Sequence, residues 1–268
     1  MSKRGKILVV DDEQVILDAV KKICENEEFS VDQSIDAMDA LVKLHKQNYD
    51  LILCDIMMPD IDGFKFLEEI AKRKIDTFVI MMTGYSTVEN AVFSLYKGAI
   101  DFIPKPFTSD ELVYSVLRGM KYIQIDKELK KQRATGQDFP MIYVPCPAKY
   151  SRLGYSAWVM IENDGSAIIG VTDLFLKTID SVKKIKFLNP GEEITQGVNC
   201  ITIISVDDST HTILSPVSGK ILENNQKLLA DNTILEKDPY FNGWLYRLIP
   251  SDVEYELKSL VPCSSDRI

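Results

Sequence analysis

Three aspartates, one threonine and one lysine each stand at the end of a short apolar run, where their side chains could act together. Asp11 and Asp12 follow the first run, and Asp55 ends another. Crowded carboxylates repel one another and need a cation, and hard oxygen ligands at a partly hydrated site suit Mg²⁺. Thr83 and Lys105, at the ends of later runs, could offer a hydroxyl and an ammonium group to phosphoryl oxygens. These residue types predict a site for phosphorylation of an aspartate.

Two alternating periods predict the elements that position this site. Apolar strand patterns at 6–10, 29–35, 50–55, 77–83 and 99–103 alternate with helical patterns at 15–23, 37–46, 63–73, 87–96 and from 109 onward. Short apolar strands that alternate with helices indicate a parallel sheet buried on both faces. We therefore predict an α/β fold with a doubly wound, five-stranded parallel sheet. Functional groups gather at the carboxyl ends of the strands in such sheets.

Four segments together carry a resemblance to a known family: Asp11-Asp12, the segment from Asp55 to Gly63, Thr83-Gly84 and the segment from Lys105 to Phe107. In this order they resemble the signature of response-regulator receivers (CheY-like, with a flavodoxin-like fold), over about residues 4–125. A single aspartate at a strand end is more often a turn or helix cap. The combination, each residue at its own strand, is what makes the resemblance specific.

The resemblance implies a role for each of these residues. Asp55 would be the phosphoacceptor, and Thr83 and Lys105 would bind the phosphoryl group. Asp12, Asp55 and the backbone carbonyl of Met57 would ligate Mg²⁺, with Asp11 helping through water. The resemblance implies two further features. Phe102 would be the rotating aromatic of a two-state switch, although an aromatic residue on a short strand is as often there for packing alone. The Lys105–Pro106 peptide bond would be cis.

The pattern changes after the last predicted helix, which keeps its apolar stripe to about Lys131. We predict a receiver domain at 1–133, a linker at 134–149 rich in helix-breaking residues, and a second domain at 150–268. Many short strands with dense turn signals predict a small, mostly-β sandwich or barrel there. The stripe through Leu117, Met120 and Ile123 packs on the sheet in its first turns, and its extension leaves both a monomer and a homodimer open.

Three segments of the second domain carry a second resemblance: Gly165 to Asp173, Ser215 to Gly219, and Asp238 to Leu245. Together they resemble the glycine-cleavage H protein, a lipoyl-carrying β fold. That family attaches lipoate to a lysine at a hairpin tip, and here Asp208 stands at this position. Because a carboxylate cannot form the required amide, no lipoyl attachment is expected, and Lys220 lies past the turn. Asp207 and Asp208 are either turn formers or an acidic contact for a partner.

Composition narrows the classes of partner. The net charge of −9 and a pI of about 4.9 disfavour binding to nucleic acid or to an anionic membrane. No apolar run approaches the roughly 20 residues that span a bilayer, and the N-terminus lacks a signal-peptide pattern, so we expect a cytoplasmic protein. The spacing of the cysteines predicts reduced, mostly buried thiols, and two histidines make a zinc site improbable.

These observations predict a two-component response regulator that is phosphorylated on Asp55 by a sensor histidine kinase. Beyond its own phosphorylation and dephosphorylation, the chain is not expected to be an enzyme. Its output would be protein interaction with an unknown downstream partner. Three alternatives stay open: a lipoyl carrier, a carrier-mimicking regulator of lipoyl enzymes, and a DNA-binding regulator, which the net acidity disfavours.

Overall fold

The computed structural model describes the chain except for residues 1–3, 85–86, 136–140 and 268. It divides into two compact units, 1–128 and 129–268, each of which is described by itself. The predicted linker 134–149 falls partly on residues 136–140, outside the described part. Among the described residues, no helix is both long and apolar enough to cross a bilayer.

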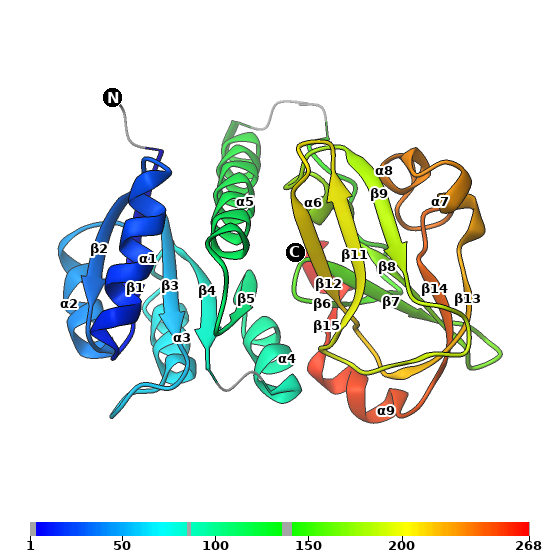
Figure 1. The fold of residues 1–268 in the computed structure, drawn as a ribbon, viewed down its shortest axis with the longest axis horizontal. Helices are drawn as coiled ribbons and strands as arrows, with labels where there is room; N and C mark the ends of the chain where they lie inside the picture. The colour runs from blue at the N-terminus through cyan, green and yellow to red at the C-terminus, as the bar shows by residue number, and fades with distance from the viewer. Residues whose placement is uncertain (1–3, 85–86, 136–140, 268) are drawn as a thin grey trace. The chain divides into compact units, whose positions relative to one another are not determined.

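The first unit is a parallel sheet with helices on both of its faces (Figure 1). Its strands are β1 (Lys6–Val10), β2 (Ser30–Ser34), β3 (Leu51–Asp55), β4 (Phe78–Thr83) and β5 (Asp101–Pro104), in the order β2-β1-β3-β4-β5. Its helices are α1 (Gln14–Asn26), α2 (Ala37–Lys46), α3 (Gly63–Lys72), α4 (Val88–Tyr96) and α5 (Ser109–Thr135), of which the part from residue 129 onward belongs to the second unit. The predicted doubly wound five-stranded sheet is confirmed.

Alternation along the strands sends side chains into two separate cores. Leu8 and Ile52 point into one core together with residues of α2 and α3. Ile7 and Leu51 point into the other, together with residues of α1 and α5. Because helices cover both faces, nearly every strand residue is buried, which explains the continuous apolar runs in the sequence.

Helix α5 uses much of its apolar stripe within the first unit. Ile123 is buried in the α1–α5 core, and Leu117 and Met120 pack against that core while partly exposed. These are the residues on which the homodimer hypothesis depends. Their packing on the unit's own sheet accounts for the stripe up to Ile123 without a second chain.

The second unit consists of two antiparallel sheets. Its strands are β6 (Ser151–Leu153), β7 (Ala157–Ile161), β8 (Ala167–Val171), β9 (Val182–Phe187), β10 (Glu193–Ile194), β11 (Asn199–Ser205), β12 (Thr210–Leu214), β13 (Gly219–Asn224), β14 (Tyr246–Pro250) and β15 (Val261–Pro262). The larger sheet has the order β10-β13-β14-β8-β7-β6-β15, and the smaller one β12-β11-β9. The predicted mostly-β architecture is confirmed.

Short helices complete this unit: α6 (Asp173–Leu176), α7 (Gln226–Ala230), α8 (Thr233–Lys237), α9 (Val253–Glu256) and the 3₁₀ turns η1 (Leu257–Ser259) and η2 (Cys263–Arg267). Tyr246 of β14 joins the two sheets, because its hydroxyl donates to the carbonyl of Cys200 at 3.0 Å and accepts from the amide of Leu188 at 2.8 Å.

The largest fully buried side chain of the second unit requires a glycine beside it. Trp158 of β7 stands opposite Gly170 of β8, and its indole Nε1 donates to the carbonyl of Val171 at 2.9 Å. A Cβ added to Gly170 would lie 2.4 Å from Cζ2 of the indole ring. The glycine is therefore needed for close approach of the ring to the neighbouring strand.

Replacing Gly170 with alanine should lower the free energy of unfolding of the second unit by about 2 kcal/mol or more, since overpacking displaces the indole. Denaturant titration followed by tryptophan fluorescence measures this, because Trp158 and Trp244 both lie in the second unit. In a Trp158→Phe background the smaller ring leaves room, and the same change should cost less than about 1 kcal/mol. An equal cost in both backgrounds would show that the ring contact is not the cause.

Candidate functional site

The strand register brings two of the predicted aspartates to one edge of the sheet. Val10 of β1 pairs with Cys54 of β3 in parallel, so that the next residues, Asp11 and Asp55, leave the sheet side by side. Strand β1 is also the point where the strand order reverses, since β2 lies on one side of it and β3 on the other. Ligands of open α/β sheets bind at such a point, outside the carboxyl ends of the strands.

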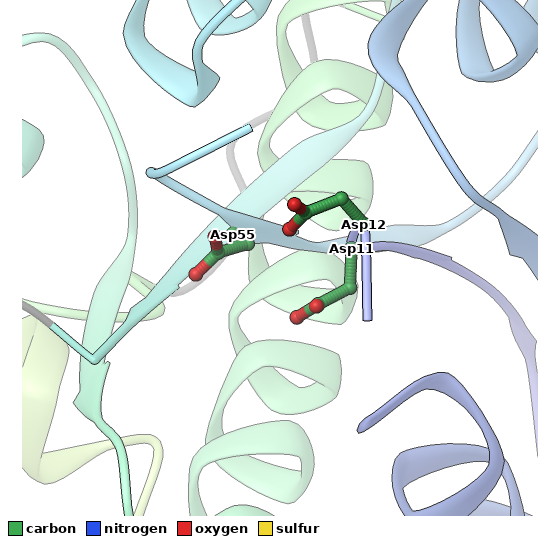
Figure 2. A group of neighbouring side chains, drawn as sticks. All are labelled: Asp11, Asp12 and Asp55. Carbon is green, nitrogen blue, oxygen red and sulfur yellow. The ribbon is translucent and has the colours of Figure 1, made fainter. Parts of the chain in front are cut away.

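Asp11, Asp12 and Asp55 form one cluster, in which a ligand atom from each lies within 4.8 Å of the others. Figure 2 shows Asp11 and Asp12 extending from the end of β1 toward the side on which Asp55 lies. Asp11 and Asp55 are buried, with 0% and 3% of their surface exposed, whereas Asp12 is exposed. Burial of two carboxylates this close together is unfavourable unless positive charge lies among them.

Lys105 supplies one positive charge to the cluster. Its Nζ lies 2.6 Å from Oδ2 of Asp11 and 2.9 Å from Oδ1 of Asp55. Burial by itself would lower the pKa of Lys105, but the two carboxylates outweigh it, and the pKa lies above its usual value. Burial raises the pKa of Asp55 and Lys105 lowers it, with a net rise. One ammonium group cannot neutralise three carboxylates.

The backbone around Asp55 fixes the direction of its carboxylate. Oδ2 accepts a hydrogen bond from the amide of Met57 at 2.9 Å, so that Oδ1 faces Lys105. Helix α3 begins directly behind it: Asp62 caps the helix, and the amide of Gly63 donates to the carbonyl of Ile56 at 2.9 Å. A Cβ at Gly63 would lie 2.3 Å from the carbonyl oxygen of Asp55, so only glycine allows this approach.

The cluster has the chemistry of a magnesium site. Three hard carboxylate ligands, of which one is exposed to water, suit a cation that keeps part of its hydration shell. Asp11, Asp12 and Asp55 could hold the ion, which would supply positive charge to a phosphoryl group bound there. That the carbonyl of Met57 is a further ligand stays a prediction.

Thr83 lies on β4 and Phe102 on β5, and Pro106 follows the end of β5. Thr83 is buried at the end of β4, and its carbonyl accepts from the amide of Lys105 at 2.7 Å, which ties the two predicted phosphoryl-binding residues together. Phe102 is half-buried and packs against the α2–α3 core. The Lys105–Pro106 peptide bond is cis, as the resemblance implied.

The comparisons with known proteins separate the two units. Residues 7–117 match the family model described as "Response regulator receiver domain". The first unit is a response regulator receiver domain. Residues 149–265 match the model "Glycine cleavage H-protein", and the second unit is an H-protein-like domain. Both resemblances found in the sequence are confirmed, and receiver domains bind Mg²⁺ at an acidic cluster of this kind.

Individual relatives match one unit at a time. "Regulatory protein VanRc" of Enterococcus gallinarum is 39% identical over 120 residues, which cover 44% of this chain and 51% of that protein. A receiver domain protein of Methanospirillum hungatei is 35% identical and covers 47% of this chain and 99% of its own, with a TM-score of 0.44. A glycine cleavage H protein of Mycobacterium marinum is 26% identical, covering 40% of this chain and 88% of its own, with a TM-score of 0.38. The chain spans about half or less of the first curated relatives that it matches.

The second unit carries its own candidate site in the turn between β11 and β12, where Asp208 lies at the position predicted for the lysine of the H-protein family. Asp208 has a positive φ of 64°, and its carboxylate forms an ion pair with Nζ of Lys183 on the neighbouring strand β9. Sequence reasoning missed Lys183, because only the pairing of β9 with β11 brings it to the turn. Both side chains are largely exposed, so the pair is weak.

Asp207, by contrast, holds the turn together. Its carboxylate accepts hydrogen bonds from the hydroxyls of Ser205 at 2.5 Å and Ser209 at 2.6 Å, and from the amide of Ser209 at 3.2 Å. The Ser205 hydroxyl also lies 3.1 Å from Nε2 of the buried His211. Burial acts to raise the pKa of Asp207, but the hydrogen bonds outweigh it and lower the pKa to about 2. Asp207 is thus a turn former.

Replacing Asp12 with asparagine should weaken Mg²⁺ binding by the full-length protein at least tenfold. Loss of outer-shell partners alone costs about 10- to 100-fold in metal affinity, and loss of a direct ligand should cost no less. Isothermal titration calorimetry with MgCl₂ measures the change. Glu13→Gln is the matched control, because Glu13 is the adjacent exposed acid and lies outside the cluster. Equal weakening in both variants would mean that general charge, and not ligation, is responsible.

Replacing Asp207 with asparagine should destabilise the second unit by about 1 kcal/mol at pH 7, since the hydrogen bonds to the charged form weaken. Because the folded pKa is lowered, the contribution of Asp207 is complete above the unfolded pKa near 4 and disappears as the pH falls toward 2. The gap between wild type and variant in urea unfolding should therefore narrow with acidification. Asp208→Asn, which breaks only an exposed ion pair, should cost less than about 0.5 kcal/mol. A larger cost for Asp208→Asn would reverse the assignment of the two residues.

Proposed function

We propose that this chain is a two-component response regulator in which Asp55 accepts a phosphoryl group from the phosphohistidine of a sensor histidine kinase. The supporting observation is the arrangement of Asp55 with two further carboxylates and the ammonium group of Lys105. The names of the curated relatives, which are regulatory proteins, agree with this proposal. The chemistry of the site requires of the partner kinase only that it donates a phosphoryl group from a phosphohistidine.

The chemical step moves one phosphoryl group. A carboxylate oxygen of Asp55 attacks phosphorus, the phosphorus–nitrogen bond of the phosphohistidine breaks, and the histidine leaves with the electron pair. Lys105, which is already 2.9 Å from Oδ1 of Asp55, stays beside the new phosphoryl oxygens and offsets their charge. Water later hydrolyses the acyl phosphate. The chain would have no other catalytic activity.

The proposed switch acts through Thr83 and Phe102. Thr83 ends β4, and its hydroxyl would bind a phosphoryl oxygen. Such a bond pulls the end of β4, whose neighbour in the sheet is β5. Phe102 lies half-buried on β5, so that an inward rotation of its ring would transmit the phosphorylation state to the unit's surface. Residues 85–86, which follow Thr83 and Gly84, lie outside the described part of the chain.

The proposed output is recognition of another protein in the cytoplasm by the H-protein-like domain or by the receiver itself. The turn 205–211 has Asp208 at the position where the H-protein family has its lipoyl lysine, which disfavours a carrier function. The acidic net charge disfavours a DNA-binding output. A homodimer through α5 stays a prediction. Leu117 and Met120 pack on the receiver core, so that less of their apolar surface is available for contact with a second chain.

Replacing Asp55 with asparagine should abolish phosphorylation of the full-length protein by a small acyl phosphate such as acetyl phosphate. The amide keeps the size of the side chain but is not a nucleophile. Intact-protein mass spectrometry measures the phosphoryl adduct, and hydroxylamine should remove it, because an acyl phosphate reacts with this nucleophile. Chelation of Mg²⁺ by EDTA should slow labelling of the wild type by roughly a hundredfold or more.

Asp60→Asn is the matched control for this experiment. Asp60 is an exposed carboxylate in the same loop, and its φ of 63° is one that asparagine adopts readily. The control should be labelled like the wild type. Adduct formation that persists in Asp55→Asn and resists hydroxylamine would place the phosphoryl group on a hydroxyl side chain and would end the proposal.

A further inference from the structure

Two cysteine thiols meet in the core of the second unit. Sγ of Cys146 and Sγ of Cys263 lie 2.7 Å apart, although the residues are separated by 117 positions in the chain. Their side chains are buried, at 4% and 0% exposure. We propose that Cys146 and Cys263 are a redox-active pair that closes to a disulfide and ties the segment entering the second unit to its C-terminal segment. This inference is independent of the chemistry at Asp55.

The backbone fixes both cysteines from two sides. Strand β15 pairs with β6 in antiparallel register, and the ladder continues with the amide of Cys263 donating to the carbonyl of Tyr150 at 3.0 Å. The amide of Tyr150 in turn donates to the carbonyl of Pro147 at 2.9 Å, which closes a turn directly after Cys146. The turn connects Cys146 to Tyr150, whose carbonyl is held by the residue that follows β15, and the two thiols meet there. The meeting of the two thiols therefore follows from the strand register.

The surroundings of the pair favour a bond between the sulfurs over metal binding. The cluster that contains both thiols is completed by the aromatic rings of Tyr150, Trp158 and Tyr240. The Tyr150 and Trp158 rings lie 4.9 Å apart, centroid to centroid. Met160, Ile168 and Trp244 pack against the same cluster, so that a metal ion placed here would have two thiolate ligands in mostly apolar surroundings, whereas a structural zinc site takes four ligands. A disulfide needs no further ligand and is itself apolar.

The other three cysteines are held apart from this pair. Cys24 lies on α1 and Cys54 on β3, both in the first unit. Cys200 lies on β11 of the second unit, where its thiol contacts the carbonyl oxygen of Ile213 at 3.5 Å. Oxidation of the folded protein should therefore give one specific pairing. The expectation from the sequence, that all five cysteines are unpaired thiols, would then fail at two of them.

The oxidant is a low-molecular-weight disulfide of the glutathione class. One cysteine, as its thiolate, attacks a sulfur of the reagent, the reagent's disulfide bond breaks, and one reagent thiolate leaves. The second cysteine then attacks the protein-bound sulfur, forms the Cys146–Cys263 bond and releases the second reagent thiolate. In total, the two protein thiols lose two protons and two electrons, and the reagent disulfide takes them up and becomes two thiols. Because both sulfurs are buried, the reaction proceeds through local opening of the segment around Cys146.

The disulfide would reinforce a contact that other groups already make. The amide of Val144 donates to Oδ2 of Asp173 at 2.6 Å, and the hydroxyl of Tyr240 donates to the carbonyl of Val144 at 3.0 Å. These two hydrogen bonds hold the same segment against the second unit, two residues before Cys146. A covalent bond between Cys146 and Cys263 would prevent the segment around Cys146 and the C-terminal turn from opening. Redox state would therefore set the stability of the second unit.

The test uses full-length protein, reduced and then incubated with oxidised glutathione. Free thiols are blocked with an alkylating reagent under denaturing conditions, and peptides are mapped by mass spectrometry without reduction. The expected result is a linked Cys146–Cys263 peptide, with Cys24, Cys54 and Cys200 alkylated. In thermal unfolding, the oxidised protein should have a midpoint higher by roughly 5 °C or more, since the bond closes a loop of over a hundred residues.

Variants assign the effect to the pair. Cys146→Ser should form no linked peptide and should show no shift on oxidation, whereas Cys200→Ser, which removes the other buried thiol of the unit, should behave like the wild type. Wild-type protein alone decides the matter if a variant does not fold. Absence of the linked peptide after prolonged oxidation, pairing that involves Cys200 to the same extent, or identical midpoints for oxidised and reduced wild type would each overturn the proposal.

Discussion

Asp11, Asp12 and Asp55 can share one edge of a sheet as carboxylates only if positive charge lies among them. Lys105 provides one such charge through two short contacts, and it reaches them because its own strand end lies beside that of Thr83. The remaining negative charge is what makes the site suitable for a divalent cation. The receiver fold is the means of bringing these groups together: parallel strands that end at one edge, a reversal of strand order at β1, and a glycine at the start of α3 that lets the helix lie against Asp55.

The sequence predicted most of this unit because its strands are buried on both faces. Continuous apolar runs, such as the run that ends at Cys54, are easily distinguished from the spaced apolar residues of the neighbouring helices. It also predicted Asp11, Asp12 and Asp55 as one cluster, since the carboxyl ends of neighbouring strands must meet. It did not predict that Lys105 bridges Asp11 and Asp55 in the absence of a phosphoryl group. That contact depends on side-chain positions across three strands, which no spacing along the chain encodes.

Prediction was poorer in the second unit, for reasons of length and locality. Strands β10 and β15 have two residues each, and α7, α8 and α9 have five or fewer, so that no periodicity can develop within them. Strand β14 was not predicted, because the segment that resembles the H protein ends at Leu245, one residue before the strand begins. The contact of Cys146 with Cys263 joins segments 117 residues apart and has no local signature. Gly170 was part of the recognised segment, but its reason, the ring of Trp158 across the strand pair, appears only in the folded structure.

The turn between β11 and β12 holds two adjacent aspartates whose carboxylates contribute unequally to the fold. Asp207 accepts the side-chain hydrogen bonds that close the turn, and the carboxylate of Asp208 takes no part in them. Asp208 instead points its carboxylate to Lys183 at the surface, where loss of the contact costs little. The constraint at Asp208 comes from its left-handed backbone, which aspartate, asparagine and glycine adopt most readily. Asp208 stands where the resemblance to the H protein predicts the lipoyl lysine, and its carboxylate is paired with the ammonium group of Lys183. Because a carboxylate cannot form the amide that carries lipoate, the prediction that this turn carries no lipoyl arm depends on Asp208 occupying that position.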